Sequence, residues 1–168
     1  MTSTRSSSND MRWLMLVIAA VVVALDRLSK LWVESHVALG QAIVVIPRTF
    51  RITHVLNTGA AFSMFEGANS QLTVRNFLVA FSVLAIVAVL IALWRIGRQA
   101  TLVSVSLALI LGGAIGNMYD RIRYAHVVDF LEVHLLHYHW PDFNVADSAI
   151  VVGACLLLIE MLRPQRQS

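Results

Sequence analysis

The sequence predicts an all-α membrane protein in which four transmembrane helices carry a small extracytoplasmic β-structure. Apolar residues make up 58% of the 168-residue chain and charged residues only 14%, whereas roughly a quarter of the residues of a soluble domain are charged. Residues 76–94 and 99–119 contain no Asp, Glu, Lys or Arg. Each stretch has the roughly 20 residues that a helix needs to cross a bilayer. We therefore expect one membrane-embedded domain over residues 1–168.

Two further spans complete the predicted bundle. The first fits residues 13–33, although three charged residues from Asp26 onward interrupt its second half, and the last fits residues 144–162. Because no small-residue cleavage pattern precedes Asp26, we expect the first segment to be a retained helix and not a cleaved signal peptide. The Ser/Thr-rich residues 1–10 are too polar to pack, so a disordered tail is expected there.

The distribution of basic residues favours cytoplasmic termini. Four spans place both chain ends on one side, with six arginines there and seven basic residues on the other side. Four of those seven lie beside acidic residues at helix ends and could belong to a site, which leaves three. The positive-inside rule then places the termini in the cytoplasm and residues 34–71 and 121–143 outside it. The arginines form no basic stripe, so no nucleic-acid partner is expected.

The two outer segments contain β-branched runs. Residues 43–46 and 50–56 are separated by a Pro-Arg-Thr break at 47–49, which predicts two short strands joined by a turn. Residues 127–135 also favour an extended strand, although a short helix is the open alternative. The β-structure is therefore expected outside the membrane.

Two aspartates stand in apolar surroundings. Asp129 lies in the sequence VVDF and Asp147 in FNVADS, where it opens the last hydrophobic run. Inserting a carboxylate at membrane depth costs roughly 2.5–3.5 kcal/mol on insertion scales, so such a residue usually has a function. Two such carboxylates brought together suggest acid–base chemistry, because like charges close together cannot both ionise easily. The alternative for Asp147 is a capping box with Asn144, and for Asp129 a pairing with Arg123.

Other polar residues extend the candidate site. Asp26 and Lys30 are four residues apart and share one helix face, with the acid on the favourable N-terminal side. A self-neutralising pair that lowers the cost of insertion would explain them equally well. Asn57 precedes the small residues of segment 57–62, which would allow close backbone approach by a ligand. The segment could equally be a loop that re-enters the membrane.

Glycines and polar residues alternate at the end of the third span. Gly112 and Gly116 form a GxxxG pair, whose usual meaning is close helix packing. Gly113, Asn117 and Arg121 follow at four-residue steps and therefore line one face. On that face an amide and a guanidinium could grip peptide carbonyls. The neighbouring Asp120 has the simpler alternative of pairing with Arg121 or Arg123.

No metal site and no cofactor is predicted. His134, His137 and His139 cluster in the second outer segment, but no carboxylate–histidine signature such as H-E-x-x-H accompanies them. A wet loop is an ordinary place for histidine, so we assign no metal ligand. Cys155 is the only cysteine, which excludes an internal disulfide and a cysteine-based zinc site.

The motifs together resemble those of the lipoprotein signal peptidases, also called signal peptidase II. The matching segments, in order, are Asp26–Lys30, 57–62, 112–121, 127–130 and 143–147. The resemblance implies a bacterial inner-membrane aspartyl endopeptidase with a four-helix bundle and a small β-cradle. Such an enzyme removes the signal peptide from prolipoproteins, just before a cysteine that carries diacylglycerol.

The resemblance also implies roles for single residues. Asp129 and Asp147 become the catalytic pair, while Arg27 departs from the glutamine expected there. The implied substrate-binding residues are Asp26, Lys30, Asn57, Gly113, Asn117, Arg121 and Asn144. The implied partners are a lipid-modified prolipoprotein, membrane lipids and globomycin-type inhibitors, with the chain acting as a monomer and without a cofactor.

General acid–base hydrolysis is the chemistry that fits. One aspartate, ionised, takes a proton from the attacking water, while the other, protonated, hydrogen-bonds the carbonyl oxygen and helps to protonate the leaving amine. Which aspartate holds the proton is open, because the pair titrates as a unit. Two rival functions also remain: an ion- or proton-coupled transporter, which would not need both carboxylates near one membrane face, and a non-catalytic assembly subunit, which would leave both without a task.

Overall fold

The computed structural model of the chain describes residues 10–59, 70–135 and 138–163. The predicted disordered tail over residues 1–10 lies outside the described residues except for its last position. The described helices are α1 (Arg12–His36), α3 (Ser70–Ile96), α4 (Leu102–Tyr124) and α5 (Val145–Leu162). The described strands are β1 (Ala42–Ile46), β2 (Phe50–Asn57), β3 (Val127–Leu135) and β4 (Tyr138–His139).

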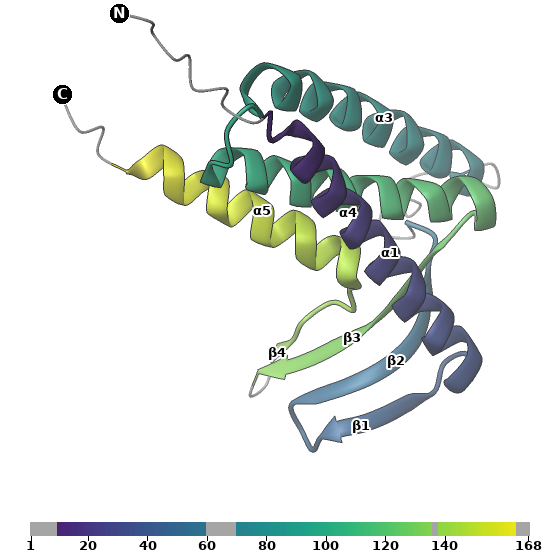
Figure 1. The fold of residues 1–168 in the computed structure, drawn as a ribbon. Helices are drawn as coiled ribbons and strands as arrows, with labels where there is room; N and C mark the ends of the chain where they lie inside the picture. The colour runs from purple at the N-terminus through teal and green to yellow at the C-terminus, as the bar shows by residue number, and fades with distance from the viewer. Residues whose placement is uncertain (1–9, 60–69, 136–137, 164–168) are drawn as a thin grey trace, which may run out of the picture.

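Helix α4 is the centre of the bundle. It contacts α1, α3 and α5, and Figure 1 shows it between α3 and α5 with α1 crossing it. Glycines permit this closeness: a Cβ on Gly112 would lie 2.7 Å from the carbonyl oxygen of Ala19 on α1. A Cβ on Gly153 of α5 would lie equally close, at 2.7 Å, to the carbonyl oxygen of Ser106 on α4. The expected packing role of small residues in the third span is confirmed.

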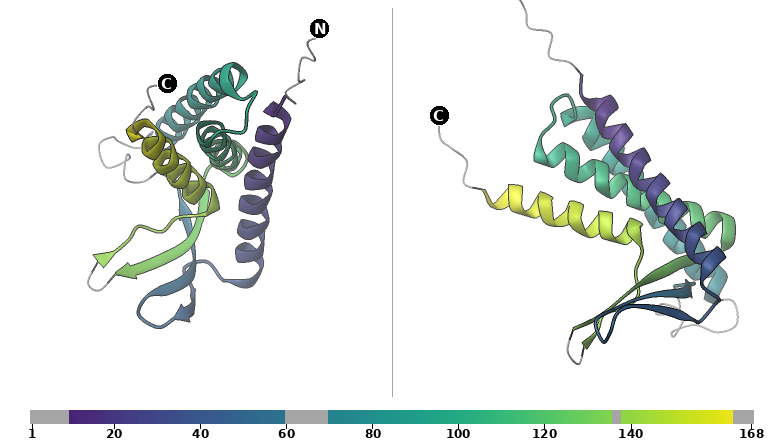
Figure 2. Two further views of the ribbon diagram at one scale, coloured as in Figure 1. Left: turned by 60° about the vertical axis from the view of Figure 1, so that its left-hand side comes forward. Right: turned by 60° about the horizontal axis from the view of Figure 1, so that its bottom comes forward.

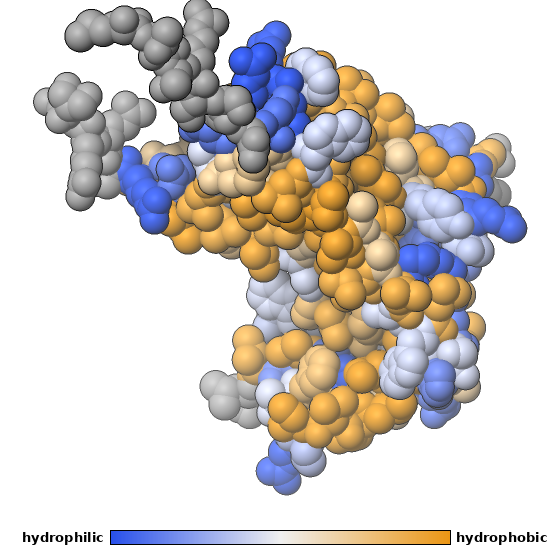
Figure 3. Space-filling model, viewed as in Figure 1, coloured by the Kyte–Doolittle hydropathy of each residue, from blue (hydrophilic) through white to orange (hydrophobic). Residues whose placement is uncertain are grey.

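The outer surface of the bundle is apolar. Phe77, Phe81 and Leu84 on one face of α3 are 61%, 63% and 70% exposed. Figure 3 shows hydrophobic residues over most of the visible helical face, with strongly hydrophilic residues mainly at its ends. A continuous exposed apolar face of this kind suits lipid and not water.

Among the residues that the structure describes, three helices have the length and composition of membrane spans. They are Gln71–Ile96, Leu102–Tyr124 and Val145–Leu162. Helix α1 overlaps the first predicted span but is not among them. Its second half carries Asp26, Arg27 and Lys30, which lower its mean hydropathy. The expectation of a helical membrane protein with a small sheet is therefore met, with three spans established by composition.

The strands form one antiparallel sheet in the order β1-β2-β3-β4. The predicted hairpin is confirmed: β1 pairs with β2 across a turn in which Arg48 has a left-handed φ of 65°. Residues 127–135 form a strand and not the alternative short helix. Strand β3 pairs with β2 on one side and with the short β4 on the other, where His134 lies opposite His139.

The sheet lies at the end of the bundle opposite the start of α1 and the end of α5, as Figures 1 and 2 show. It is attached there by an apolar cluster in which Val33 and Val37 of α1 pack on Val128 and Phe130 of β3. Because side chains alternate along a strand, anchoring Val128 and Phe130 turns Asp129 towards the other face of β3. The attachment of the sheet thus decides where this aspartate points.

Candidate active site

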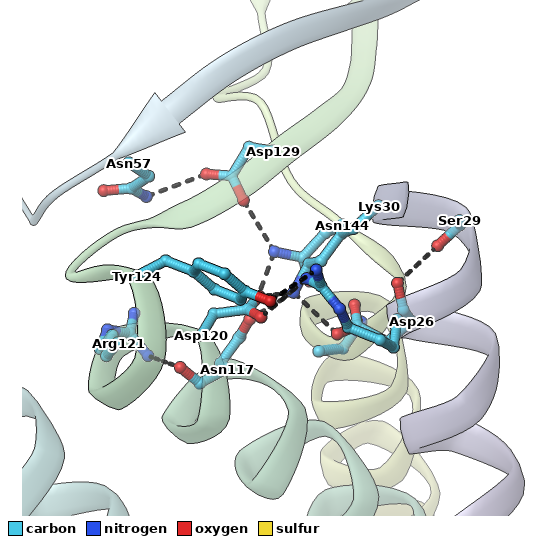
Figure 4. Close-up of polar contacts among 12 residues, drawn as sticks. Asp26, Ser29, Lys30, Asn57, Asn117, Asp120, Arg121, Tyr124, Asp129 and Asn144 are labelled. Atoms are coloured by element: carbon cyan, nitrogen blue, oxygen red, sulfur yellow. Dashed lines mark hydrogen bonds and ion pairs between the residues drawn. The ribbon is translucent and has the colours of Figure 1, made fainter. Parts of the chain in front are cut away.

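Asp129 is buried in the middle of β3 and is hydrogen-bonded through both carboxylate oxygens. It pairs with Val55 of β2, so Asn57, two residues further along β2, is a diagonal neighbour on the same face. Asn57 Nδ2 donates to Asp129 Oδ2 at 2.9 Å, and Asn144 Nδ2 donates to Oδ1 at 2.7 Å. Figure 4 shows Asp129 held between these two amides. Its side chain is thereby fixed in one orientation.

Asp147 lies in the first turn of α5 and completes the predicted capping box. The Asn144 side chain accepts from the Asp147 N–H at 2.9 Å, and Asp147 Oδ2 accepts from the Asn144 N–H at 3.3 Å. Its other oxygen, Oδ1, accepts from Asn117 Nδ2 of α4 at 2.7 Å. Asp147 is therefore both a helix cap and a member of the polar site, so the two readings of this residue do not compete.

Two asparagines connect the aspartates. Asn144 is fully buried, and its Nδ2 lies 3.3 Å from Oδ1 of Asn117 as well as bonding Asp129. Asn117 in turn donates to Asp147, so a continuous chain of hydrogen bonds runs from one carboxylate to the other. Amides suit this position because each offers both a donor and an acceptor without adding charge.

A buried ion network lies beneath the asparagines. Lys30 is 0% exposed, and its Nζ lies 2.7 Å from Asp26 Oδ2 and 2.6 Å from Asp120 Oδ2. The same ammonium lies 3.3 Å from Oδ1 of Asn117. Asp120 also pairs with Arg27, at 3.3 Å. The buried Asp26 and Asp120 are thus each paired with a base, which is the condition under which buried charges are tolerated, and Arg27 also lies 3.7 Å from the more exposed Glu34.

The ion network also positions the start of α5. Asp26 Oδ1 accepts the backbone N–H of Ala146 at 2.9 Å, directly before Asp147. Gly116 makes room for this carboxylate, since a Cβ there would lie 2.8 Å from Asp26 Oδ2. Helix α1 thus holds the first turn of α5 through one hydrogen bond.

The sequence missed Asp120 and assigned Arg27 no role. The alternative of an Asp120 pair with Arg121 or Arg123 is replaced by pairing with Lys30 and Arg27 of α1. Arg27 also lies 3.7 Å from Glu34 of its own helix, so nothing in the local sequence pointed to a partner on α4. Asp120 also lies three residues after Asn117, on a neighbouring part of the α4 surface.

Gly113 and Arg121 complete the residues named in advance on α4. A Cβ on Gly113 would meet the carbonyl oxygen of Ala146 and lie 2.7 Å from Ile150 Cγ1, so this glycine lets α4 pack on α5. Arg121 is half-buried, and its Nη1 lies 3.4 Å from the carbonyl oxygen of Asn117. The small residues that follow Thr58 and Gly59 in segment 57–62 lie outside the described residues.

The electrostatics of Asp129 set it apart from an ordinary carboxylate. Burial raises its pKa to about 6, and the negative charge of Asp147 adds to this effect. The hydrogen bonds from Asn57 and Asn144 act in the opposite direction, because they favour the ionised form. A carboxyl group with such a pKa can hold a proton close to neutral pH, as an acid catalyst requires.

A cavity of about 510 Å³ opens beside Asp147. Val151 and Val152 of α5 line one part of it, and the segment before α5 lines the rest. That segment contributes Trp140, Pro141, Asp142 and Phe143. The lining is mainly apolar with a carboxylate at its edge, which is the composition of a site for an apolar peptide segment.

Comparison with known proteins agrees with this geometry. A family described as Signal peptidase (SPase) II matches residues 18–163. A lipoprotein signal peptidase of Solibacter usitatus is 43% identical over 159 residues, which cover 95% of this chain and 96% of that protein. One of Pseudomonas putida is 46% identical over 157 residues, covering 92% and 88%. A solved structure of a bacterial membrane enzyme has a TM-score of 0.80 at 28% identity, covering 90% of this chain and 94% of that one.

Fold, site and comparisons together define a helical membrane enzyme with a pair of aspartates at one end of its bundle. The chain belongs to the signal peptidase II family, which is a family of aspartic peptidases. The resemblance seen in the sequence motifs is thereby confirmed.

Proposed function

We propose that the chain is an intramembrane aspartyl endopeptidase that removes the signal peptide from diacylglyceryl-modified bacterial prolipoproteins. The cut falls before the lipidated cysteine. The observation that carries the proposal is the hydrogen-bonded chain from Asp129 through Asn144 and Asn117 to Asp147. Four side chains from three separate parts of the chain converge there beside a cavity that is open to an apolar segment.

In the proposed mechanism Asp129 holds the shared proton and Asp147 is ionised. Asp147 takes a proton from water, whose oxygen attacks the scissile carbonyl carbon. The carboxylic acid of Asp129 hydrogen-bonds the carbonyl oxygen as negative charge develops on it. Collapse of the tetrahedral intermediate breaks the C–N bond, and a proton is returned to the leaving amine. The raised pKa of Asp129, caused mainly by burial, supports this division of roles.

The remaining polar residues are proposed to bind the substrate backbone or to shape the site. Asn57 is exposed at the end of β2 while it bonds Asp129, so one end of its amide faces the approach to the site. Arg121 carries the positive charge nearest to Asn117 on its own helix and is proposed to meet substrate carbonyls. Asp26, Lys30 and Gly113 are proposed to act indirectly, by holding α1, α4 and α5 in the arrangement that positions the aspartates.

We also propose that α1 is the fourth span and that both termini are cytoplasmic. The charges of α1 that lower its hydropathy, Asp26 and Lys30, are paired inside the bundle and do not face lipid. The first turn of α1 and the last turn of α5 lie at the end opposite the sheet (Figure 1). Arg12 stacks there on Trp94, at 4.3 Å from the ring centroid, as in an interfacial belt of aromatic and basic residues. The enzyme would lie in the bacterial inner membrane.

The proposed substrate reaches the site along α5. Its apolar signal segment would lie against Val151 and Val152, which places the scissile bond at Asp147 in the first turn of the helix. Globomycin-type peptides are expected to compete for this site. One chain supplies both aspartates, so a monomer suffices.

One experiment separates this proposal from its rivals. The purified protein in detergent is incubated with a lipid-modified prolipoprotein, with and without a chelator. We expect release of the signal peptide in both samples, because the aspartate pair needs no metal. A transporter or a passive assembly subunit would release no signal peptide, and the absence of release would refute the proposed function.

A further inference from the structure

A second cluster of ionisable side chains lies at the far end of β3. His134 and His139 face each other across the β3–β4 pair, and their ring centroids are 4.8 Å apart. Both Nε2 atoms approach the same oxygen, Oε1 of Glu132, at 2.8 Å from His134 and 3.0 Å from His139. Glu132 and His134 are two residues apart on one strand, so they project from the same face. Three potential ligand atoms therefore converge within 4.8 Å of one another.

A buried carboxylate lies beside the cluster, next to His139. Oδ1 of Asp142 lies 3.6 Å from Nε2 of His139. This oxygen is buried and accepts no hydrogen bond from the described residues, whereas Oδ2 of the same carboxylate accepts from Thr53 Oγ1 at 3.3 Å. A buried carboxylate oxygen without a donor is uncommon in a folded protein, and a bound cation nearby would compensate its charge.

One positive side chain already contacts the cluster. Arg51 donates through Nε to Oε2 of Glu132 at 2.6 Å. Its Nη2 contacts Oε1 of Glu132 and Nε2 of His134. The Arg51 side chain is 41% exposed. The guanidinium as a whole can therefore turn into water and leave Oε1 free for a metal ion.

We propose that Glu132, His134 and His139 form a binding site for a divalent transition-metal ion, with zinc as the best match. Two imidazole nitrogens and a carboxylate oxygen suit zinc, whereas calcium and magnesium prefer an all-oxygen set. In a tetrahedral zinc site with bonds of about 2.0–2.1 Å, neighbouring ligand atoms lie about 3.4 Å apart. The two Nε2 atoms lie 2.8 and 3.0 Å from Oε1 of Glu132, and all three ligand atoms lie within 4.8 Å of one another.

The position of the site gives the metal a structural role, separate from the peptide hydrolysis. The ligands belong to the part of the chain that joins the two aspartates: β3 carries Asp129, and Asp142 is followed by Asn144 and Asp147. Phe143, which follows Asp142, is joined to Leu131 of β3 by backbone hydrogen bonds. A metal ion held by Glu132 and His134 of β3 and by His139 of β4 would fix this hairpin, from which the chain leads through Asp142 into α5.

Zinc binding by the full-length protein tests the proposal. The untagged protein in detergent is stripped with a chelator, dialysed against zinc chloride and assayed for bound zinc by atomic emission. Wild type should retain about one zinc ion per chain, and His134→Gln and His139→Gln should each weaken binding by at least about tenfold. His36→Gln is the matched control, since His36 lies on α1 and contacts Trp32 and Ser35. It should bind zinc as wild type does.

Arg51→Gln distinguishes a metal site from a hydrogen-bonded cluster. The substitution removes the competing cation, so zinc should bind more tightly than to wild type. If the cluster is only a set of hydrogen bonds, the variant will bind no zinc, and the proposal is wrong.

A measurement on the wild type covers the case in which the histidine variants fail to fold. Zinc should protect His134 and His139 from acylation by diethyl pyrocarbonate, as peptide mass spectrometry reports, and should leave His36 reactive. Equal labelling with and without zinc, or no zinc retained by wild type, would overturn the proposal.

Discussion

The ammonium group of Lys30 on α1 lies 2.6 Å from Oδ2 of Asp120 on α4, and both side chains are buried. This contact joins the two helices that carry most of the polar site. The same ammonium bonds Asp26, which holds the first turn of α5 through Ala146. One buried cation therefore sets the relative positions of three helices, and the geometry of the aspartate pair depends on it.

Removing Asp120 should damage the enzyme without touching the reacting atoms. In Asp120→Ala, Lys30 and Arg27 each lose a buried partner, and breaking a buried pair typically costs about 3–5 kcal/mol. We expect lower yield, a lower melting temperature in detergent and reduced cleavage. Asp10→Ala is the control, because its 3.4 Å ion pair with Arg12 lies at the surface. A variant with wild-type melting and rate would show that the network is dispensable.

Substitution of either aspartate by asparagine should abolish cleavage. Asp129→Asn and Asp147→Asn keep the shape of the side chain but cannot exchange the proton, so we expect a loss of at least about a hundredfold in rate. Both proteins should still fold and bind globomycin, which a binding assay on the purified variants measures. Substantial turnover by either one would refute the assignment of the pair.

The pH dependence of cleavage should report the protonation of Asp129. The proposed mechanism needs its protonated form, so kcat/KM should fall as pH rises through about 6. Asn57→Ala removes a hydrogen bond that lowers this pKa, and the fall should move to higher pH while the overall rate drops. Asn76→Ala, at an exposed position on α3, serves as the control. An unshifted profile in Asn57→Ala would mean that another group controls this limb.

The stability of the protein should change with the charge of Asp129. Because the folded-state pKa is raised to about 6, the favourable contribution of this group is complete below its ordinary value near 4 and is lost as pH rises through about 6. Asp129→Asn should therefore raise the free energy of unfolding by up to about 3 kcal/mol at pH 7, with little gain at pH 4. Thermal melting in detergent at both pH values measures this, and equal shifts at the two values would contradict it.

The lipid on the substrate should determine where the chain is cut. The aspartate pair lies at the end of the bundle that carries the sheet, so the scissile bond must be held at that height. The diacylglyceryl chains can do so, because each buried CH₂ contributes about 0.8 kcal/mol to membrane anchoring. An unmodified prolipoprotein should be cut very poorly even at saturating concentration, which a comparison of kcat for the two substrates measures. Efficient cleavage of the unlipidated form would show that the lipid does not position the bond.

The metal assignment illustrates what local sequence cannot show. The three histidines carry no helical zinc signature, and His137 lies outside the described residues. The ligand set emerges only when β3 pairs with β4 and places His139 opposite His134, with Asp142 beside them. Cross-strand partners are set by register, and register depends on pairing between segments and on the turn that joins them.

The amino-acid sequence by itself determined the apolar helices, the hairpin at residues 43–56 and the helix cap at Asn144, and it singled out the two aspartates that the structure joins through asparagines. These features follow from local composition, periodicity and capping chemistry, which neighbouring residues decide. Only the tertiary structure decided that Asp120 pairs with Lys30, that Gly113 serves the contact between α4 and α5, and that two asparagines connect the carboxylates. The reason is physical: a buried charge or amide takes whichever partner the packed helices bring within about 3 Å, and that partner lies far away in the chain.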